Sequence, residues 1–173
     1  MMLKIVGGFL TIAASTMIGL IYSINLSKRP LELLTLCGMM EMLETQLKYF
    51  SSILSDAFYE ISKSTDSTVS IFFCDASKIM KNDGNIPAAV AWRESVEKNI
   101  KLTSLNKEDM NVLISFGKSL GNTDLEGQIK NIKFIVEQLK IQWSKAESSR
   151  KKDEKLYKNL GFLGGLAIVI ILI

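Results

Sequence analysis

Residues 125–146 read LEGQIKNIKFIVEQLKIQWSKA, and this stretch is the most informative part of the chain for its fold. Its apolar side chains recur in alternating steps of four and three residues over three heptads, which is the period of one face of an α-helix. The residues of this seam are Leu125, Ile129, Ile132, Val136, Leu139, Trp143 and Ala146. Such a seam suits a coiled coil or packing within a helical bundle, and of the two we favour the bundle.

The same spacing upstream predicts five further helices. From Leu33 to Ile61 apolar residues recur every three or four positions, with a break at Ser51-Ser52. The expected helices cover about residues 31–50, 53–63, 67–82, 86–101 and 106–120. With the last helix they form an all-α, six-helix bundle over residues 28–158.

Helix ends are marked by turn and capping residues. Asn82-Asp83-Gly84-Asn85 predicts a turn, and Asn106 predicts an N-cap to which Asp109 bonds back. Gly121 suits the left-handed conformation that closes a helix. Thr123-Asp124-Leu125-Glu126 predicts a capping box for the last helix, with Thr123 as the N-cap.

Residues 1–27 are expected to form an N-terminal transmembrane helix. No charged residue occurs between Ile5 and Ser27, and this run of about 22 residues gives roughly 33 Å of helix, enough to cross a hydrocarbon core of roughly 30 Å. A cleaved signal peptide is the alternative. We favour the span, because Ala13-Ala14-Ser15 lies in the middle of a run that continues to Ile21.

Residues 159–173 are expected to form a short C-terminal transmembrane segment. Leu160 to Ile173 are 14 apolar residues, about 21 Å if helical, which is short for a span. A buried C-terminal core helix is the alternative, but a core helix normally keeps a polar stripe and this segment has none. Small residues four apart, Ser15/Gly19 and Gly161/Gly165, would let such helices pack closely.

The flanking charges predict the orientation in the cell membrane. Lys28 and Arg29 follow the first segment, and residues 145–158 before the second hold six basic and three acidic side chains. Because cationic flanks stay on the cytoplasmic side, the middle domain is expected to be cytoplasmic, with the lipid bilayer as its neighbour.

The composition disfavours an enzyme, a metal or cofactor site and a nucleic-acid binder. The chain has no histidine, two cysteines and a net charge of +3. Cys37 and Cys74 have no partner at metal-ligand spacing and are expected to be buried thiols. Glu41 and Glu44 lie one turn apart and are expected to be a solvated face, since no histidine accompanies them.

Taken together, these residues resemble the stage III sporulation protein AB family over nearly the whole chain. The resemblance is carried, in order, by Arg29-Pro30, Met42-Leu43-Glu44-Thr45, Tyr49, Ala91-Trp92, Phe116-Gly117-Lys118-Ser119-Leu120-Gly121-Asn122-Thr123-Asp124, Gln128, Leu156-Tyr157-Lys158-Asn159-Leu160-Gly161 and Gly164-Gly165. One departure is Phe50-Ser51-Ser52-Ile53, where the family usually has a Gly followed by Thr-Pro. This departure bears on the shape of the turn at Ser51-Ser52 and not on the resemblance to the family.

The resemblance implies a component of the SpoIIIA–SpoIIQ secretion-like channel between mother cell and forespore, in the mother-cell membrane. It also implies helical domains similar to those of the type II secretion platform protein GspF. The implied partners are the SpoIIIAA ATPase and other SpoIIIA membrane proteins, and a homo-oligomer is possible. Candidate partner contacts are Glu44, Tyr49, Gly121, Thr123, Asp124, Glu126 and Gln128. The alternative function is a membrane-anchored regulatory or sensor bundle with a soluble signalling partner.

Overall fold

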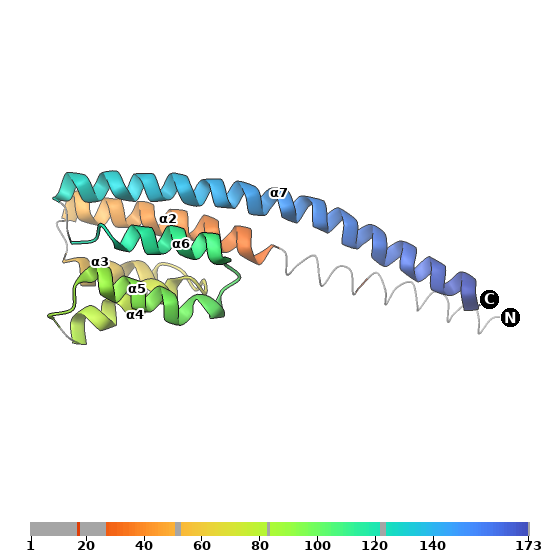
Figure 1. Cartoon of the computed structure of the whole chain (residues 1–173), viewed down its shortest axis with the longest axis horizontal. Helices are drawn as coiled ribbons and strands as arrows, with labels where there is room; N and C mark the ends of the chain where they lie inside the picture. Colours follow the sequence, from red (N-terminus) through yellow and green to blue (C-terminus); the bar gives the residue numbers. More distant parts are fainter. Residues whose placement is uncertain (1–16, 18–26, 51–52, 83, 122–123, 173) are drawn as a thin grey trace. The chain divides into compact units, whose positions relative to one another are not determined.

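All regular structure in the described part of the chain is helical. The computed structural model describes Met17 and residues 27–50, 53–82, 84–121 and 124–172, apart from the side chains of Phe50, Lys155 and residues 157–172. Within these residues lie α2 (Lys28–Phe50), α3 (Leu54–Lys63), α4 (Ser70–Asn82), α5 (Ala88–Asn99), the 3₁₀ turn η1 (Ile100–Leu102), α6 (Lys107–Gly117) and α7 (Leu125–Leu172). The predicted all-α class with six helices in this part of the chain is confirmed (Figure 1).

The chain divides into two compact units. One comprises Leu31–Ser144 and holds the bundle, and the other comprises Met1–Pro30 with Lys145–Ile173. Helix α7 has residues in both. In the part of the chain that could be searched, no helix is both long enough and apolar enough to cross a bilayer. The predicted first segment, apart from Met17 and Ser27, and the side chains of the second lie outside the described residues.

An aromatic cluster holds α3, α4, α5 and α6 together. Trp92 meets Phe58, Phe73 and Phe116 edge-to-face, with ring centroids 5.4, 5.0 and 5.1 Å away. All four side chains are buried, and each such pair contributes about 0.5–1.5 kcal/mol beyond its buried area. The indole Nε1 donates to the carbonyl oxygen of Leu113 at 2.6 Å, so that the one polar atom of the ring is paired.

Aliphatic packing joins α2 to the first part of α7. The buried residues are Leu33, Leu36, Met40, Leu43 and Leu47 on α2 and Ile132, Ile135, Val136 and Leu139 on α7. Two surface ion pairs connect the same helices, Lys133 to Glu44 at 3.5 Å and Lys140 to Glu41 at 3.7 Å. Their order shows that the two helices run antiparallel, side by side in Figure 1.

Side-chain hydrogen bonds to the backbone connect elements distant in sequence. Buried Glu32 on α2 accepts from the backbone N–H of Ser104 at 2.7 Å. The hydroxyl of Ser95 on α5 donates to the carbonyl of Phe72 on α4 at 2.7 Å. Because buried polar groups cost free energy when unpaired, these bonds fix the register of helices whose apolar faces alone would tolerate sliding.

Most predicted helix ends are confirmed. Asn106 accepts from the N–H of Asp109, whose carboxylate accepts from the N–H of Asn106 in return, which completes the capping box. Gly121 has φ +76°, as predicted. The α-helix before it ends at Gly117 and not at Leu120, because the N–H groups of Ser119 and Leu120 bond three residues back.

Three predicted helix starts are wrong, and the first is that of α2, which begins at Lys28 and not at residue 31. Helix α7 begins at Leu125, and Asp124 caps it, since its carboxylate accepts from the N–H of Gly127 at 3.0 Å. Glu126 therefore stands one position too early for a capping box, and Thr123 lies outside the described residues. Helix α4 begins at Ser70 and not at residue 67, because the N–H of Ser67 bonds to the hydroxyl of Thr65 in a turn.

The buried face of α7 rotates relative to the predicted seam. Leu125 is 48% exposed and Trp143 is partly exposed, whereas Ile135 and Gln142, which the seam omits, are buried. A straight helix has 3.6 residues per turn, so that its buried face drifts away from a strict 3.5-residue repeat. The bundle interpretation is thus right, and four of the seam residues, Ile132, Val136, Leu139 and Ala146, are buried as predicted.

Candidate partner-binding surfaces

The acidic start of α7 is open to solvent. Asp124 and Glu126 are exposed, and Gly121 is exposed just before them. The Asp124 carboxylate caps the helix through one oxygen, so that its charge lies at the positive end of the helix dipole. Gln128 is half-buried, and its N–H bonds to the carbonyl of Asp124 at 2.9 Å.

The other two candidates, Glu44 and Tyr49, lie on α2. Glu44 is half-buried and ion-paired with Lys133 at 3.5 Å. Tyr49 is 69% exposed, with the ammonium of Lys48 5.1 Å from its ring centroid. Because α2 and α7 run antiparallel, the last turn of α2 lies at the same end of the bundle as the first turn of α7. The structure thus brings Tyr49 to the end that carries Asp124 and Glu126, and it leaves Glu44 further along the pair.

A hydrogen bond connects this end of α7 to the segment before it. The side-chain amide of Asn131 donates to the hydroxyl of Ser119, which in turn donates to the carbonyl of Phe116 at 3.0 Å. The side chains of Asn131 and Ser119 therefore join the two sides of the α6–α7 connection. We call the exposed set Tyr49, Gly121, Asp124 and Glu126 the acidic end.

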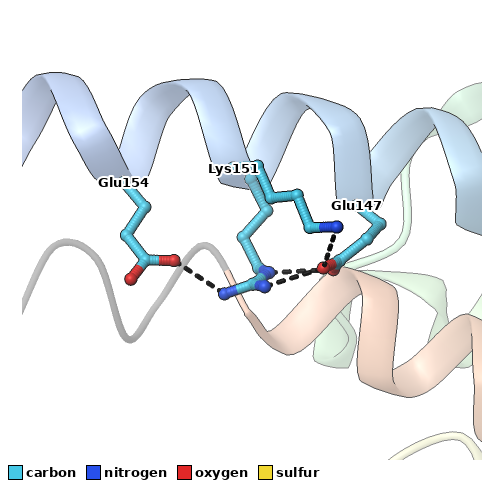
Figure 2. Close-up of polar contacts among 4 residues, drawn as sticks. Glu147, Lys151 and Glu154 are labelled. Atoms are coloured by element: carbon cyan, nitrogen blue, oxygen red, sulfur yellow. Dashed lines mark hydrogen bonds and ion pairs between the residues drawn. The ribbon is translucent and has the colours of Figure 1, made fainter.

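Four side chains on α7 form a charged cluster that the sequence analysis missed. Arg150 donates from Nε and Nη2 to the two oxygens of Glu147, at 2.8 and 2.7 Å, and from Nη1 to Glu154 at 2.7 Å. Lys151 lies 3.9 Å from Glu147 (Figure 2). These hydrogen bonds, which Arg150 donates and Glu147 accepts, lower the pKa of Glu147 and raise the pKa of Arg150.

The cluster neutralises part of the positive charge of the basic stretch before the C-terminal segment. Residues 145–158 have more basic than acidic side chains, but Arg150 is ion-paired with two carboxylates of this stretch. Lys145, Lys151 and Lys152 of the same stretch are exposed, and Asp153 is half-buried. Spacings of three and four between acids and Arg150 were visible in the sequence and could have predicted the cluster.

Other predicted residues show mixed outcomes. Cys37 is buried, and burial raises its pKa from 9.0 to about 11, whereas Cys74 is only partly buried. Glu41 and Glu44 are ion-paired with lysines of α7 and not merely solvated.

In the ranges that the structure describes, no three His, Cys, Asp or Glu side chains are placed to hold a metal ion. Ser15 and Gly19 lie outside these ranges, and for Gly161 and Gly165 only the helical backbone is described.

Comparison with known proteins identifies the family. The family described as Stage III sporulation protein AB (spore_III_AB) matches residues 4–173. The chain belongs to this family. It is 32% identical over 171 residues to Stage III sporulation protein AB of Bacillus subtilis (strain 168), covering 99% of each chain.

A solved structure of the family has the same fold. It is that of Stage III sporulation protein AB (SpoIIIAB), which is 30% identical and superposes with a TM-score of 0.68. The match covers 72% of this chain and 98% of the solved one. Membership in the family implies a role in sporulation, and the all-α bundle is the fold of the family.

Proposed function

We propose that this protein is a non-enzymatic membrane platform of the SpoIIIA–SpoIIQ secretion-like channel, and that it docks the SpoIIIAA ATPase at the mother-cell membrane. In this proposal its bundle corresponds to the helical domains of GspF, and other SpoIIIA membrane proteins surround it. Family membership supports the role in sporulation. The observation that carries the docking part is the exposed acidic end, because a soluble partner needs an accessible and chemically distinct surface.

The membrane part of the proposal rests on the two apolar runs. Residues 5–27 contain no charge, and residues 160–173 are apolar throughout. The backbone of α7 is helical to Leu172, so that the second run begins within a helix that already satisfies its own backbone hydrogen bonds. Lys28, Lys151 and Lys152 are exposed beside the runs, where cationic groups favour the cytoplasmic side.

Fractionation tests the membrane part. The untagged protein should sediment with membranes after high-speed centrifugation and should be released by detergent but not by alkaline carbonate. Release by carbonate alone would show a peripheral protein. Protease added outside intact cells should leave the bundle uncut if the middle domain is cytoplasmic.

Charge removal at the acidic end tests the docking part. Asn caps a helix as well as Asp does, so that Asp124→Asn with Glu126→Gln removes two charges and keeps the cap. We expect this variant to co-purify at least about tenfold less ATPase, since truncating charged contacts at an interface commonly costs more than 1.4 kcal/mol.

The matched control is Glu94→Gln with Glu97→Gln, which removes two exposed charges from α5. The control should bind the ATPase as the wild type does. Equal binding by the acidic-end variant and the wild type would exclude this docking site. Equal losses in both variants would indicate a general effect of net charge.

A further inference from the structure

Helix α2 exposes large apolar side chains on the face opposite its core. Leu31, Leu34, Met42 and Tyr49 are 64%, 52%, 41% and 69% exposed. Single exposed apolar residues need no explanation, but four along the same side of one helix are a candidate contact surface. On the described outer face of α7, in contrast, Phe134 and Ile141 stand among lysine, glutamate and glutamine residues.

The exposed face of α2 has the period of a coiled-coil seam. Its residues follow one another in steps of four, three, four, three and four, and none is charged. They are Leu31, Thr35, Gly38, Met42, Thr45 and Tyr49, and we call them the outer seam. A 3.5-residue repeat of uncharged side chains is the pattern that packs against another helix at a shallow left-handed angle.

The polar atoms of the outer seam are already satisfied within α2. Thr35 donates its hydroxyl to the carbonyl of Leu31, and Thr45 donates to that of Glu41, each at 3.0 Å. With their hydroxyls bonded back to the helix, the two threonines can be covered without losing a hydrogen bond to water. The nearby Glu41 carboxylate is engaged by Lys140. The seam thus suits an uncharged helix better than a charged partner.

Gly38 lies at the middle of the seam and leaves room for close approach. A β-carbon there would meet no atom within 4 Å, so that the glycine is not required by packing inside the chain. Glycine in the middle of a helix costs roughly 0.5–1 kcal/mol relative to alanine. Small residues at such positions allow two helix backbones to come close.

We infer that the outer seam of α2 binds the outer seam of a second copy of this chain, with the two α2 helices parallel. This inference rests on the proposed membrane location. The uncharged run 5–27 ends where α2 begins, at Lys28, so that copies in one membrane start α2 at the same membrane face. Parallel helices in register place every seam residue opposite itself, which is the arrangement of a two-fold symmetric interface.

The size of the seam explains why the pairing depends on the membrane. Six side chains from each copy bury much less than the roughly 1,600 Å² of a standard stable interface. Confinement of both copies to one surface raises their effective concentration, as a short linker does, to the millimolar range. Weak contacts between the seams then suffice.

Disulfide cross-linking of the full-length protein in its native membranes tests the inference. Met42→Cys is introduced into a Cys74→Ser background. Buried Cys37 remains in this background, and the Cys74→Ser chain without Met42→Cys shows that Cys37 alone forms no cross-link. Copper phenanthroline should convert this variant to a covalent dimer. Lys78→Cys, at an exposed position of α4, is the matched control and should stay monomeric.

A second substitution tests the contact at Gly38. Adding Gly38→Glu to the Met42→Cys variant should lower the dimer yield at least about tenfold, because two like charges would face each other across the seam. The fold should survive, since Gly38 is exposed and a β-carbon there meets no atom within 4 Å. Unchanged circular dichroism will verify this.

Three outcomes would overturn the inference. These are a dimer yield for Met42→Cys no higher than for Lys78→Cys, a yield unaffected by Gly38→Glu, and a cross-link to a different protein in place of the self-dimer. The same membranes are fractionated in parallel. Protein in the supernatant would refute the proposed membrane location, whereas membrane-bound protein without the cross-link refutes only the pairing.

Discussion

A β-carbon at Gly117 would lie 2.8 Å from Cδ1 of Trp92, closer than real β-carbons approach any atom. The indole cannot move away freely, because its Nε1 is bonded to the carbonyl of Leu113 and its ring is surrounded by three phenylalanines. Helix α6 therefore approaches α5 at a position where only glycine fits.

Gly117→Ala should destabilise the bundle by about 1–3 kcal/mol, the usual cost of inserting a methyl group into a packed core. Thermal unfolding in mild detergent, followed by near-ultraviolet circular dichroism, measures the effect. Gly38→Ala is the control, because it adds the same methyl group where no atom lies within 4 Å. It should stabilise the protein by about 0.5–1 kcal/mol, and a loss in both variants would contradict the packing explanation.

Asn106→Ala should cost about 1 kcal/mol, since it removes the acceptor for the N–H of Asp109 at the start of α6. Asn106→Ser should restore most of the loss. The comparison variant is Asn111→Ala, an exposed substitution within the same helix, which should be neutral or slightly stabilising. Urea unfolding of the three variants decides between a capping effect and a general effect of removing asparagine.

Because of Asp75, the free energy of unfolding should decrease as the pH falls into the acid range. Partial burial opposes its charge, but hydrogen bonds from Asn99 and Lys98, at 2.8 and 2.9 Å, outweigh burial and lower its pKa. A lowered pKa in the folded state stabilises the fold at neutral pH, and this contribution is lost as the pH falls through that pKa. Asp75→Ala should therefore lower the free energy of unfolding by about 1–2 kcal/mol at pH 7. The difference in this free energy between the variant and the wild type should become smaller at acid pH. A gap independent of pH would contradict this.

Cys37 should make the protein less stable as the pH rises, whereas Asp75 makes it less stable as the pH falls. Burial raises its pKa from 9.0 to about 11, so that between these values the folded chain keeps a proton that the unfolded chain loses. Stability should fall as the pH rises from 9 to 11, and the fall should be smaller in Cys37→Ala. In the native protein at pH 8, a thiol reagent should label Cys74 before Cys37. Equal labelling rates would show that Cys37 is accessible.

Arg150→Lys should loosen α7 despite keeping the charge. The guanidinium bonds to both oxygens of Glu147 and to Glu154 at once, and a lysine ammonium cannot reproduce this fork. Hydrogen exchange at the amides of residues 147–154 should become faster in low salt. The difference from the wild type should shrink in 1 M salt, where charge interactions are screened. Lys152→Arg, at an exposed position nearby, should leave the exchange unchanged.

Sequence patterns predicted the helices because their signals are local. The capping box of Asn106 and Asp109 and the positive φ of Gly121 need only a few neighbouring residues, and both are confirmed. The start of α7 was misplaced by one residue, since Thr123 and Asp124 are both good caps and only the geometry shows which carboxylate or hydroxyl meets an N–H.

The tertiary features could not be predicted in the same way. That Gly117 faces Trp92 depends on how α5 and α6 cross, and that Glu32 accepts from Ser104 depends on a contact between residues 72 positions apart. The outer seam of α2 is an intermediate case. Its spacing was visible, but only the burial of the opposite face shows which of two apolar stripes on α2 is left uncovered.

The two indoles of this chain stand in different surroundings, which gives the protein two natural optical reporters. Trp92 is enclosed by aromatic rings, whereas Trp143 on α7 is partly exposed. A Trp143→Phe chain would emit from the α5–α6 core alone, and a Trp92→Phe chain from α7 alone. Blue-shifted and red-shifted fluorescence can therefore follow the interior and the long helix separately in unlabelled protein, during assembly as well as during unfolding.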